Sequence, residues 1–227
     1  MISKLQWDSN FWGTDIYSVD NVVGGEFSNA YPSYPLIQYL IPCHDVKQIK
    51  IANSEGFEFV QGKVTLEKNN NYKCDIDSTN FKPLTMKDLD SKGDMFYDLY
   101  SDNCRYKMFP RKRINDYYYT WLKNSIAGQL DDECIGYYIE NEFAGFVSYK
   151  KSSDNTLVIG LIGVFPQFHR RGISQKLLNY VDYYAYQNNC HSILVATQDS
   201  NKSAINAYIK YGYNIHSIEY WYYKISF

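Results

Sequence analysis

Residues 164–178 read V-F-P-Q-F-H-R-R-G-I-S-Q-K-L-L, and this stretch decides how the second half of the chain folds. Pro166 ends the β-branched run T-L-V-I-G-L-I-G-V of residues 156–164, which predicts a strand. After Gly172, apolar residues recur at helical spacing, which predicts a helix. The loop between them, H-R-R-G-I-S, could contact a nucleic-acid backbone, form a solvated basic turn or bind a phosphate group.

The charge balance of the chain narrows these three readings. The 227 residues carry 23 Lys and Arg against 25 Asp and Glu, a formal net charge of -2, so the composition argues against a nucleic-acid partner. A glycine-containing turn between a buried strand and a helix points unpaired backbone N–H groups at one place, where the helix dipole also favours an anion. The loop therefore predicts an anion site in which Gly172 and Ser174 let a diphosphate approach, while Arg170 and Arg171 add charge nearby.

Cysteine usage and hydropathy predict a soluble, cytoplasmic protein with reduced thiols. The five cysteines are widely spread and none forms a C-x-x-C pair, so neither a disulfide framework nor a zinc site is expected. The four histidines lack metal-ligand spacing, and we expect no metal. The N-terminus has no apolar signal core, and no run approaches the roughly 18 apolar residues of a membrane span, so we expect no membrane association.

Hydrophobic periodicity predicts further elements on both sides of the loop. The predicted strands are residues 134–140, 142–150, 156–164, 192–198 and 214–225, the first two joined by a tight turn at Asn141. The predicted helices run from the capping box T-M-K-D after Pro83 toward Asn103, over 114–126 to Gly128, from near Gly172 through 185, and from a cap at Asp199, Ser200 or Asn201 to Gly212. Two glycines within 156–164 suggest a bulge or a close backbone approach. This order predicts an α/β fold with a mixed central sheet flanked by helices.

A gapless match links the first part of the chain to the last. Residues 36–59, beginning L-I-Q-Y-L-I-P, align with residues 192–215, beginning S-I-L-V-A-T-Q. The residues set opposite one another include Asp45 and Asn201, Ala52 and Tyr208, and Gly56-Phe57 and Gly212-Tyr213. Any strand–helix–strand segment shares this outline, so duplication and coincidence both stay open. The first segment has no counterpart of R-R-G-I-S, so a repeat would have kept the scaffold without the chemistry.

Two motifs together resemble those of the GNAT acetyltransferase family. They are V-F-P-Q-F-H-R-R-G-I-S-Q-K-L-L and N-K-S-A-I-N-A-Y-I-K-Y-G-Y, the latter at residues 201–213, and they stand at the expected separation. The resemblance covers about Leu84 to the C-terminus, and it departs from the family pattern at His169, where glutamine or arginine is usual, and at Ser174, where glycine or alanine is. It implies a GNAT fold with a degenerate half-GNAT N-terminal domain at residues 1–78 and a catalytic domain at residues 79–227.

The resemblance also implies acetyl-CoA as co-substrate, with the diphosphate over residues 170–175 and the pantetheine arm along the strand that ends at Val164. The implied cofactor-binding residues are Ile162, Gly163, Val164, Arg170, Arg171, Gly172, Ile173, Ser174, Gln175 and Asn201. The implied catalytic residue is Tyr208, facing the sulfur. Because a phenol with a pKa of about 10 is a weaker acid than a thiol with a pKa of about 8.5, we expect Tyr208 to donate a hydrogen bond as charge develops. A helix cap at Asn201 and a half-buried aromatic at Tyr208 are the structural alternatives.

The base that accepts the amine proton is not identified by sequence. Many family members carry a glutamate at the position that corresponds to Ala196 here. Ordered water or another group, such as Asp199, could take the proton instead. Loss of this carboxylate also leaves open a CoA-binding module without turnover.

The acceptor is suggested by two further stretches. L-Q-W-D-S-N-F-W-G, residues 5–13, and S-D-N-C-R-Y-K-M-F-P with the following R-I-N-D-Y-Y-Y-T-W-L-K-N-S-I resemble a GNAT subgroup of the dTDP-fucosamine acetyltransferase type, which acetylates nucleotide-linked amino sugars. For the aromatics Trp7, Phe11 and Trp12 alone, packing of a first strand on the core is the plainer explanation. A small amino-sugar nucleotide is the expected substrate; a protein N-terminus, a polyamine or another small amine is the alternative. The oligomeric state is open, and a homodimer is compatible with the sequence.

Overall fold

The computed structural model describes residues 1–24, 34–70, 76–93, 99–100 and 104–226. The chain forms two compact units that interleave along the sequence. Unit 1 comprises Met1–Val64, Gln198–Ser200 and Ser217–Phe227, and unit 2 comprises Thr65–Thr197 and Asn201–His216. The division into domains at residues 1–78 and 79–227 stays a prediction.

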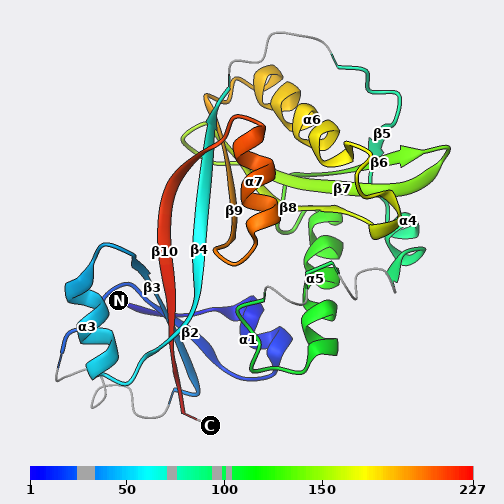
Figure 1. The fold of residues 1–227 in the computed structure, drawn as a ribbon. Helices are drawn as coiled ribbons and strands as arrows, with labels where there is room; N and C mark the ends of the chain where they lie inside the picture. The colour runs from blue at the N-terminus through cyan, green and yellow to red at the C-terminus, as the bar shows by residue number, and fades with distance from the viewer. Residues whose placement is uncertain (25–33, 71–75, 94–98, 101–103, 227) are drawn as a thin grey trace. The chain divides into compact units, whose positions relative to one another are not determined.

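Unit 1 is built on strands in the order β1-β2-β3-β10-β4 (Figure 1). Its elements are β1 (Ile2–Lys4), α1 (Gln6–Trp12), β2 (Ile16–Val19), β3 (Leu36–Pro42), α3 (Val46–Ser54) and parts of β4 (Glu58–Asn69) and β10 (Asn214–Ile225). β2 pairs with β3 in parallel, whereas β1 with β2 and β3 with β10 are antiparallel pairs. Its core includes Ile37, Ile41, Ala52 and Phe57, all buried.

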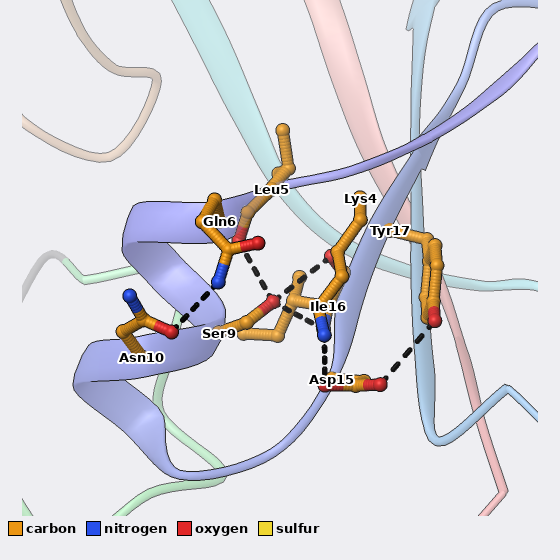
Figure 2. Close-up of polar contacts among 8 residues, drawn as sticks. All are labelled: Lys4, Leu5, Gln6, Ser9, Asn10, Asp15, Ile16 and Tyr17. Atoms are coloured by element: carbon orange, nitrogen blue, oxygen red, sulfur yellow. Dashed lines mark hydrogen bonds and ion pairs between the residues drawn. The ribbon is translucent and has the colours of Figure 1, made fainter.

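The aromatic segment near the N-terminus is a helix, α1, and of its aromatics Trp12 is buried. Figure 2 shows how this helix is tied to β2: Ser9 Oγ accepts from Ile16 N at 2.9 Å and donates to Leu5 O at 2.7 Å. Gly13 ends the helix at a φ of 71°, a left-handed conformation that glycine adopts without strain. The ion pair between Lys4 and Asp15 lies beside this junction.

Unit 2 contains strands in the order β4-β9-β8-β7-β6-β5, with β10 beside β4 (Figure 1). Its remaining elements are β5 (Phe81–Pro83), α4 (Met86–Asp90), α5 (Arg111–Ile126), β6 (Glu133–Ile139), β7 (Glu142–Lys151), β8 (Thr156–Val164), the 3₁₀ turn Pro166–Phe168, α6 (Ile173–Gln187), β9 (Ser192–Gln198) and α7 (Lys202–Lys210). β5, β6, β7 and β8 pair antiparallel in sequence, and β8 pairs with β9 in parallel. The predicted mixed sheet flanked by helices is therefore confirmed.

Local sequence signals set most of these boundaries. The turn between β6 and β7 has a positive φ at Glu140 and Asn141, as a tight hairpin requires. The capping box at Thr85 and Asp88 begins α4 as predicted. We expected this helix to continue toward Asn103, but α4 ends at Asp90, so that expectation is wrong. Residues 94–98 and 101–103 lie outside the described part of the chain.

The predicted bulge in residues 156–164 is present at Gly160. Ser148 of β7 pairs with Leu161 and Tyr149 pairs with Ile159, so Gly160 is the extra residue of β8. A Cβ atom on Gly160 would lie 2.5 Å from a carboxylate oxygen of the buried Asp131. The carboxylate accepts hydrogen bonds of 2.7 Å from both Ser125 Oγ and Ser148 Oγ. The bulge therefore exists where the backbone must pass close to a buried, hydrogen-bonded carboxylate.

The strand–helix–strand match within the sequence is also present in the structure. β3, α3 and β4 have seven, nine and twelve residues, as do β9, α7 and β10, and the bounds of all three pairs coincide in the gapless alignment. The equivalent hydrogen bonds are Cys43 N to Ile218 O and Asp199 N to Gly62 O, both 3.0 Å, and Ser226 N to Pro35 O and Asn70 N to His191 O, both 2.9 Å. Each copy of the first strand thus pairs in the same register with the last strand of the other copy. That the first copy belongs to a degenerate half-GNAT domain stays a prediction.

No helix among the described residues is both long and apolar enough to cross a bilayer.

Candidate functional site

The site begins where β8 and β9 part. Their parallel pairing runs from Thr156 opposite Ser192 to Ile159 opposite Val195 and stops there, although β8 continues to Val164. The bulge at Gly160 comes directly after the last pair. The end of β8 therefore presents one backbone edge that β9 does not cover.

Ile162 and Val164 direct their backbone groups to this uncovered edge. Residues of an antiparallel pair alternate between facing the partner and facing away, and Phe165 N donates to Ala144 O at 3.1 Å. Ile162 and Val164 consequently face away from β7. Tyr100 Oη donates to the carbonyl oxygen of Ile162 at 2.9 Å, and His169 Nε2 lies 2.9 Å from the carbonyl oxygen of Val164.

The loop after β8 has the conformation of an anion-binding turn. Gly172 is the N-cap residue of α6, with a φ of 71° and no side-chain hydrogen bond to the first turn. Arg170 also has a positive φ, of 62°, which costs a non-glycine residue about 1–2 kcal/mol. Such strain in a folded protein often marks a functional position. The free N–H groups of the first turn and the helix dipole make this end of α6 suited to a phosphate group.

A cleft of about 600 Å³ lies between the end of β8, this loop and α7. It is lined by Ile162, Gly163, Val164, Phe168, His169, Arg170, Gly172, Ile173, Ser174, Leu178, Asn201, Ser203, Ala204, Ala207 and Tyr208. We call it the cleft below. Residues of both sequence motifs line it. Among the described lining residues, Arg170 is the one from the set Asp, Glu, Lys and Arg.

Tyr208 lines the cleft from the last turns of α7 and is 6% exposed. Its ring lies 5.7 Å from that of Tyr213, and its hydroxyl has no hydrogen-bond partner among the described residues. Burial raises the pKa of Tyr208 above its usual value, so the phenol stays protonated at neutral pH. A phenol in this state can donate a hydrogen bond to an anion that forms in the cleft.

Asn201 caps α7 and also lines the cleft, so the predicted cap is confirmed at this residue. Its Oδ1 accepts from Ala204 N at 3.2 Å, and its Nδ2 donates to Thr197 Oγ1 at 3.1 Å. An amide oxygen has a second lone pair and the amide nitrogen a second proton, so each can still contact a ligand. The cap and a binding role are compatible.

Two predicted residues lie apart from the rest. The Arg171 guanidinium lies 5.5 Å from the centre of the Phe168 ring, and Arg171 is not among the residues that line the cleft. Gln175 is exposed on α6 and does not line it either. The first-turn residue Lys176 is bound to Tyr137 Oη at 2.7 Å.

Sequence reasoning missed six lining residues: Phe168, His169, Leu178, Ser203, Ala204 and Ala207. Ser203, Ala204 and Ala207 could have been found, since they are small residues within one turn of Tyr208 or one turn before it, on the helix that Asn201 begins. Small side chains there let a ligand approach the helix.

No carboxylate lines the cleft among the described residues. Asp199 packs against Gly62 in unit 1, where its carboxylate would lie 2.4 Å from a Cβ atom on that glycine. Ala196 is exposed on β9. No group of three or more His, Cys, Asp or Glu side chains suited to a metal ion occurs in the described ranges.

Comparison with known proteins identifies a relationship over much of the chain. Residues 94–213 match the sequence profile of the Acetyltransferase (GNAT) family. The chain is also 23% identical over 226 residues to a dTDP-fucosamine acetyltransferase of Escherichia coli O6:H1, and the match spans 98% of this chain and 97% of that protein.

Solved structures show the same fold. A GCN5-related N-acetyltransferase from Sphaerobacter thermophilus aligns with a TM-score of 0.60 at 13% identity, over 84% of this chain. This chain spans 59% of the length of that protein. A tandem GNAT protein from the clavulanic acid biosynthesis pathway aligns with a TM-score of 0.61 at 9% identity, over 94% of this chain and 76% of that one.

Proposed function

The chain belongs to the GNAT family and is an acetyl-CoA-dependent N-acetyltransferase, and from this premise we propose that it acetylates the amino group of a dTDP-linked amino-dideoxy sugar in a ternary complex. The observation that carries the reaction is the cleft, in which a free phenol, an uncovered strand edge and an anion-binding turn come together. The acceptor class rests on the match to a dTDP-fucosamine acetyltransferase over nearly the full length of both chains.

The residues of the cleft fit acetyl-CoA. The first turn of α6 is uncapped and follows a glycine with a positive φ, so Gly172, Ile173 and Ser174 would hold the diphosphate through backbone N–H groups, with Arg170 adding charge. Ile162, Gly163 and Val164 would hold the pantetheine arm at the uncovered edge of β8, and Asn201 would contact the arm from α7. Arg171 and Gln175 would act only at the rim, because they do not line the cleft.

Tyr208 would act on the leaving group. Acetyl-CoA supplies an acetyl thioester, whose carbonyl carbon forms a bond to the amine nitrogen while the bond to sulfur breaks and the sulfur leaves as a thiolate. Because burial raises the pKa of Tyr208, full transfer of its proton to a thiolate is uphill, so the phenol stabilises the developing charge by a hydrogen bond. The proton lost by the amine would pass to water, since no described carboxylate lines the cleft.

A basic segment supports an acceptor that carries phosphate groups. Between residues 105 and 113 the chain has five cationic side chains and no acidic one: Arg105, Lys107, Arg111, Lys112 and Arg113. All but Arg105 are exposed. α5 begins at Arg111 with no capping side chain and no acidic residue in its first turn, and the N-terminal end of a helix favours an anion.

The distance along α5 from its basic first turn to Tyr118 is compatible with a sugar phosphate as acceptor. Tyr118, on the same helix, stacks on Tyr100, whose hydroxyl is bound to the uncovered edge of β8. The basic first turn lies about 10 Å from Tyr118 along the helix axis, at about 1.5 Å per residue. A hexose and its first phosphate bridge a length of this order, which would bring the amino group toward the cleft while the basic turn binds phosphate.

A turnover screen tests the proposal. Purified protein is given acetyl-CoA with dTDP- and UDP-linked amino sugars, polyamines or peptides, and release of free CoA is measured. We expect turnover with dTDP-linked 4-amino-4,6-dideoxyhexoses. Turnover with peptides or polyamines alone would overturn the acceptor class, and binding of acetyl-CoA without any turnover would instead favour a CoA-binding module.

A further inference from the structure

Tyr100 makes a contact that the two sequence motifs do not account for. It stands 62 residues before its partner on a segment between α4 and α5, and its hydroxyl donates to the carbonyl oxygen of Ile162 at 2.9 Å. This carbonyl faces the edge of β8 that β9 no longer covers. Tyr100 thus supplies the hydrogen bond that a neighbouring strand would otherwise make.

The same segment packs on the next residue of β8. A Cβ atom on Gly163 would lie 2.6 Å from Leu99 Cδ2 and 3.0 Å from the Phe146 ring, so Leu99 packs closely on this glycine. Gly163 pairs with Phe146 of β7 on one edge, whereas β9 does not pair with it on the other. On the edge that β9 leaves uncovered, the peptide between Ile162 and Gly163 is contacted by Leu99 and Tyr100.

The Tyr100 ring is itself held in place. It stacks on the Tyr118 ring of α5, with centroids 4.4 Å apart and an interplanar angle of 27°. The Tyr118 hydroxyl is hydrogen-bonded to Cys104 rather than to β8. The Tyr100 hydroxyl thus contacts β8, whereas the Tyr118 hydroxyl contacts the segment before α5.

Tyr100 also lies close to the proposed catalytic phenol. Burial raises the pKa of Tyr100 well above its usual value, and the charge of an ionised Tyr208 would raise it further, so the two phenols are near enough to interact. Tyr208 lines the cleft, and Tyr100 is hydrogen-bonded to Ile162, which lines it too.

We propose that Tyr100 is a positioning residue for acetyl transfer: its hydrogen bond to the Ile162 carbonyl fixes the uncovered end of β8, so that the backbone donors of Ile162 and Val164 stay aligned with the reacting thioester. This inference rests on the proposed function. Donors that stabilise a developing negative charge act only within a few tenths of an ångström of their best position. At residues 162–164, β8 is held by β7 on one edge only, and β9 does not hold the other edge.

The test compares two variants that each remove one hydroxyl from the stacked pair. Tyr100→Phe should lower kcat about tenfold, the effect of one net hydrogen bond, with the KM for acetyl-CoA little changed. Tyr118→Phe removes a buried hydroxyl that does not touch β8 and should leave kcat near the wild-type value. In the free protein, amide hydrogen exchange at Gly163, whose N–H faces β7, should be faster in Tyr100→Phe and unchanged in Tyr118→Phe.

Equal loss of kcat in both variants would mean that the pair is merely structural and would overturn the proposal. Wild-type kcat and exchange in Tyr100→Phe would overturn it as well. The exchange measurement needs no acceptor, so a failure of the turnover screen and a failure of this inference are distinguishable.

Discussion

Ala52 and Tyr208 occupy equivalent positions in the two copies of one strand–helix–strand unit. Each carbonyl accepts a 3.0 Å hydrogen bond from the backbone N–H of a buried aromatic residue, Phe57 in the first copy and Tyr213 in the second. A glycine with positive φ precedes that aromatic residue in both copies. The backbone is thus the same, and the difference is a fully buried methyl group in one copy and a phenol that lines the cleft in the other.

This relationship separates scaffold from chemistry. Asp45 and Asn201 both cap their helices, accepting from Gln48 N at 3.0 Å and from Ala204 N at 3.2 Å. Within the described ranges, the second copy alone follows an uncovered strand edge and a turn suited to an anion.

Charge at Gly172 should decide whether acetyl-CoA binds. Gly172→Asp puts a carboxylate at the end of α6 where the diphosphate would lie, and binding should be abolished in calorimetry. Gly172→Asn is the matched control, because asparagine has nearly the same shape and tolerates a left-handed φ. Retained tight binding in the aspartate variant, or equal loss in both, would contradict an anion site here.

The two arginines of the loop should differ. Arg170 lines the cleft, whereas Arg171 lies over the Phe168 ring. Arg170→Gln should weaken acetyl-CoA binding about tenfold, the order expected for one charge-assisted contact, and Arg171→Gln much less. The difference should shrink at high salt. Equal effects of the two substitutions on the dissociation constant would show that the structure does not distinguish their roles.

Gly160→Ala should destabilise unit 2. The added methyl group would meet the Asp131 carboxylate, which two serine hydroxyls hold in place, and overpacking of this kind costs about 1–3 kcal/mol. Gly93→Ala is the control, since no atom of the described residues lies within 4 Å of its added Cβ and its φ is ordinary. Urea unfolding gives both free energies. A Gly160→Ala variant as stable as the control would show that the bulge is not required.

Stability should fall at alkaline pH because of buried tyrosines. Burial raises the pKa of Tyr100, Tyr118, Tyr149, Tyr208 and Tyr213. A phenol whose pKa is higher in the folded state keeps its proton there, so its contribution is fully present below a pH of about 10, the unfolded pKa, and is lost above it. Urea unfolding combined with phenolate absorbance across this range measures the effect. Constant stability from about pH 9 to about pH 11 would contradict it.

The sequence predicts correctly those strands whose ends are set by nearby residues. The strands at residues 156–164 and 192–198 have the predicted bounds, since β-branched runs end at Pro166 and at a helix cap. The helix α1 was not predicted, because three large aromatics in seven residues gave no clear period and the helix is fixed by Ser9 and the distant backbone of Ile16.

The residues of the site likewise fall into those that the sequence predicts and those that only the fold shows. Arg170, Gly172 and Tyr208 lie within motifs whose chemistry can be read from spacing. Tyr100 and Asp131 cannot be found in this manner, since each acts on β8 from a segment far away in sequence, and only the folded sheet brings them to the carbonyl of Ile162 and to Gly160.

The most direct test of the account is the Tyr208→Phe variant, assayed with the acceptor that the turnover screen identifies. Loss of the phenol hydroxyl should lower kcat by about 100-fold or more, the usual range for general acid catalysis, while calorimetry should give nearly the wild-type affinity for acetyl-CoA. Wild-type kcat in this variant would contradict the role of Tyr208 and, with it, the account of the cleft as the site of acetyl transfer.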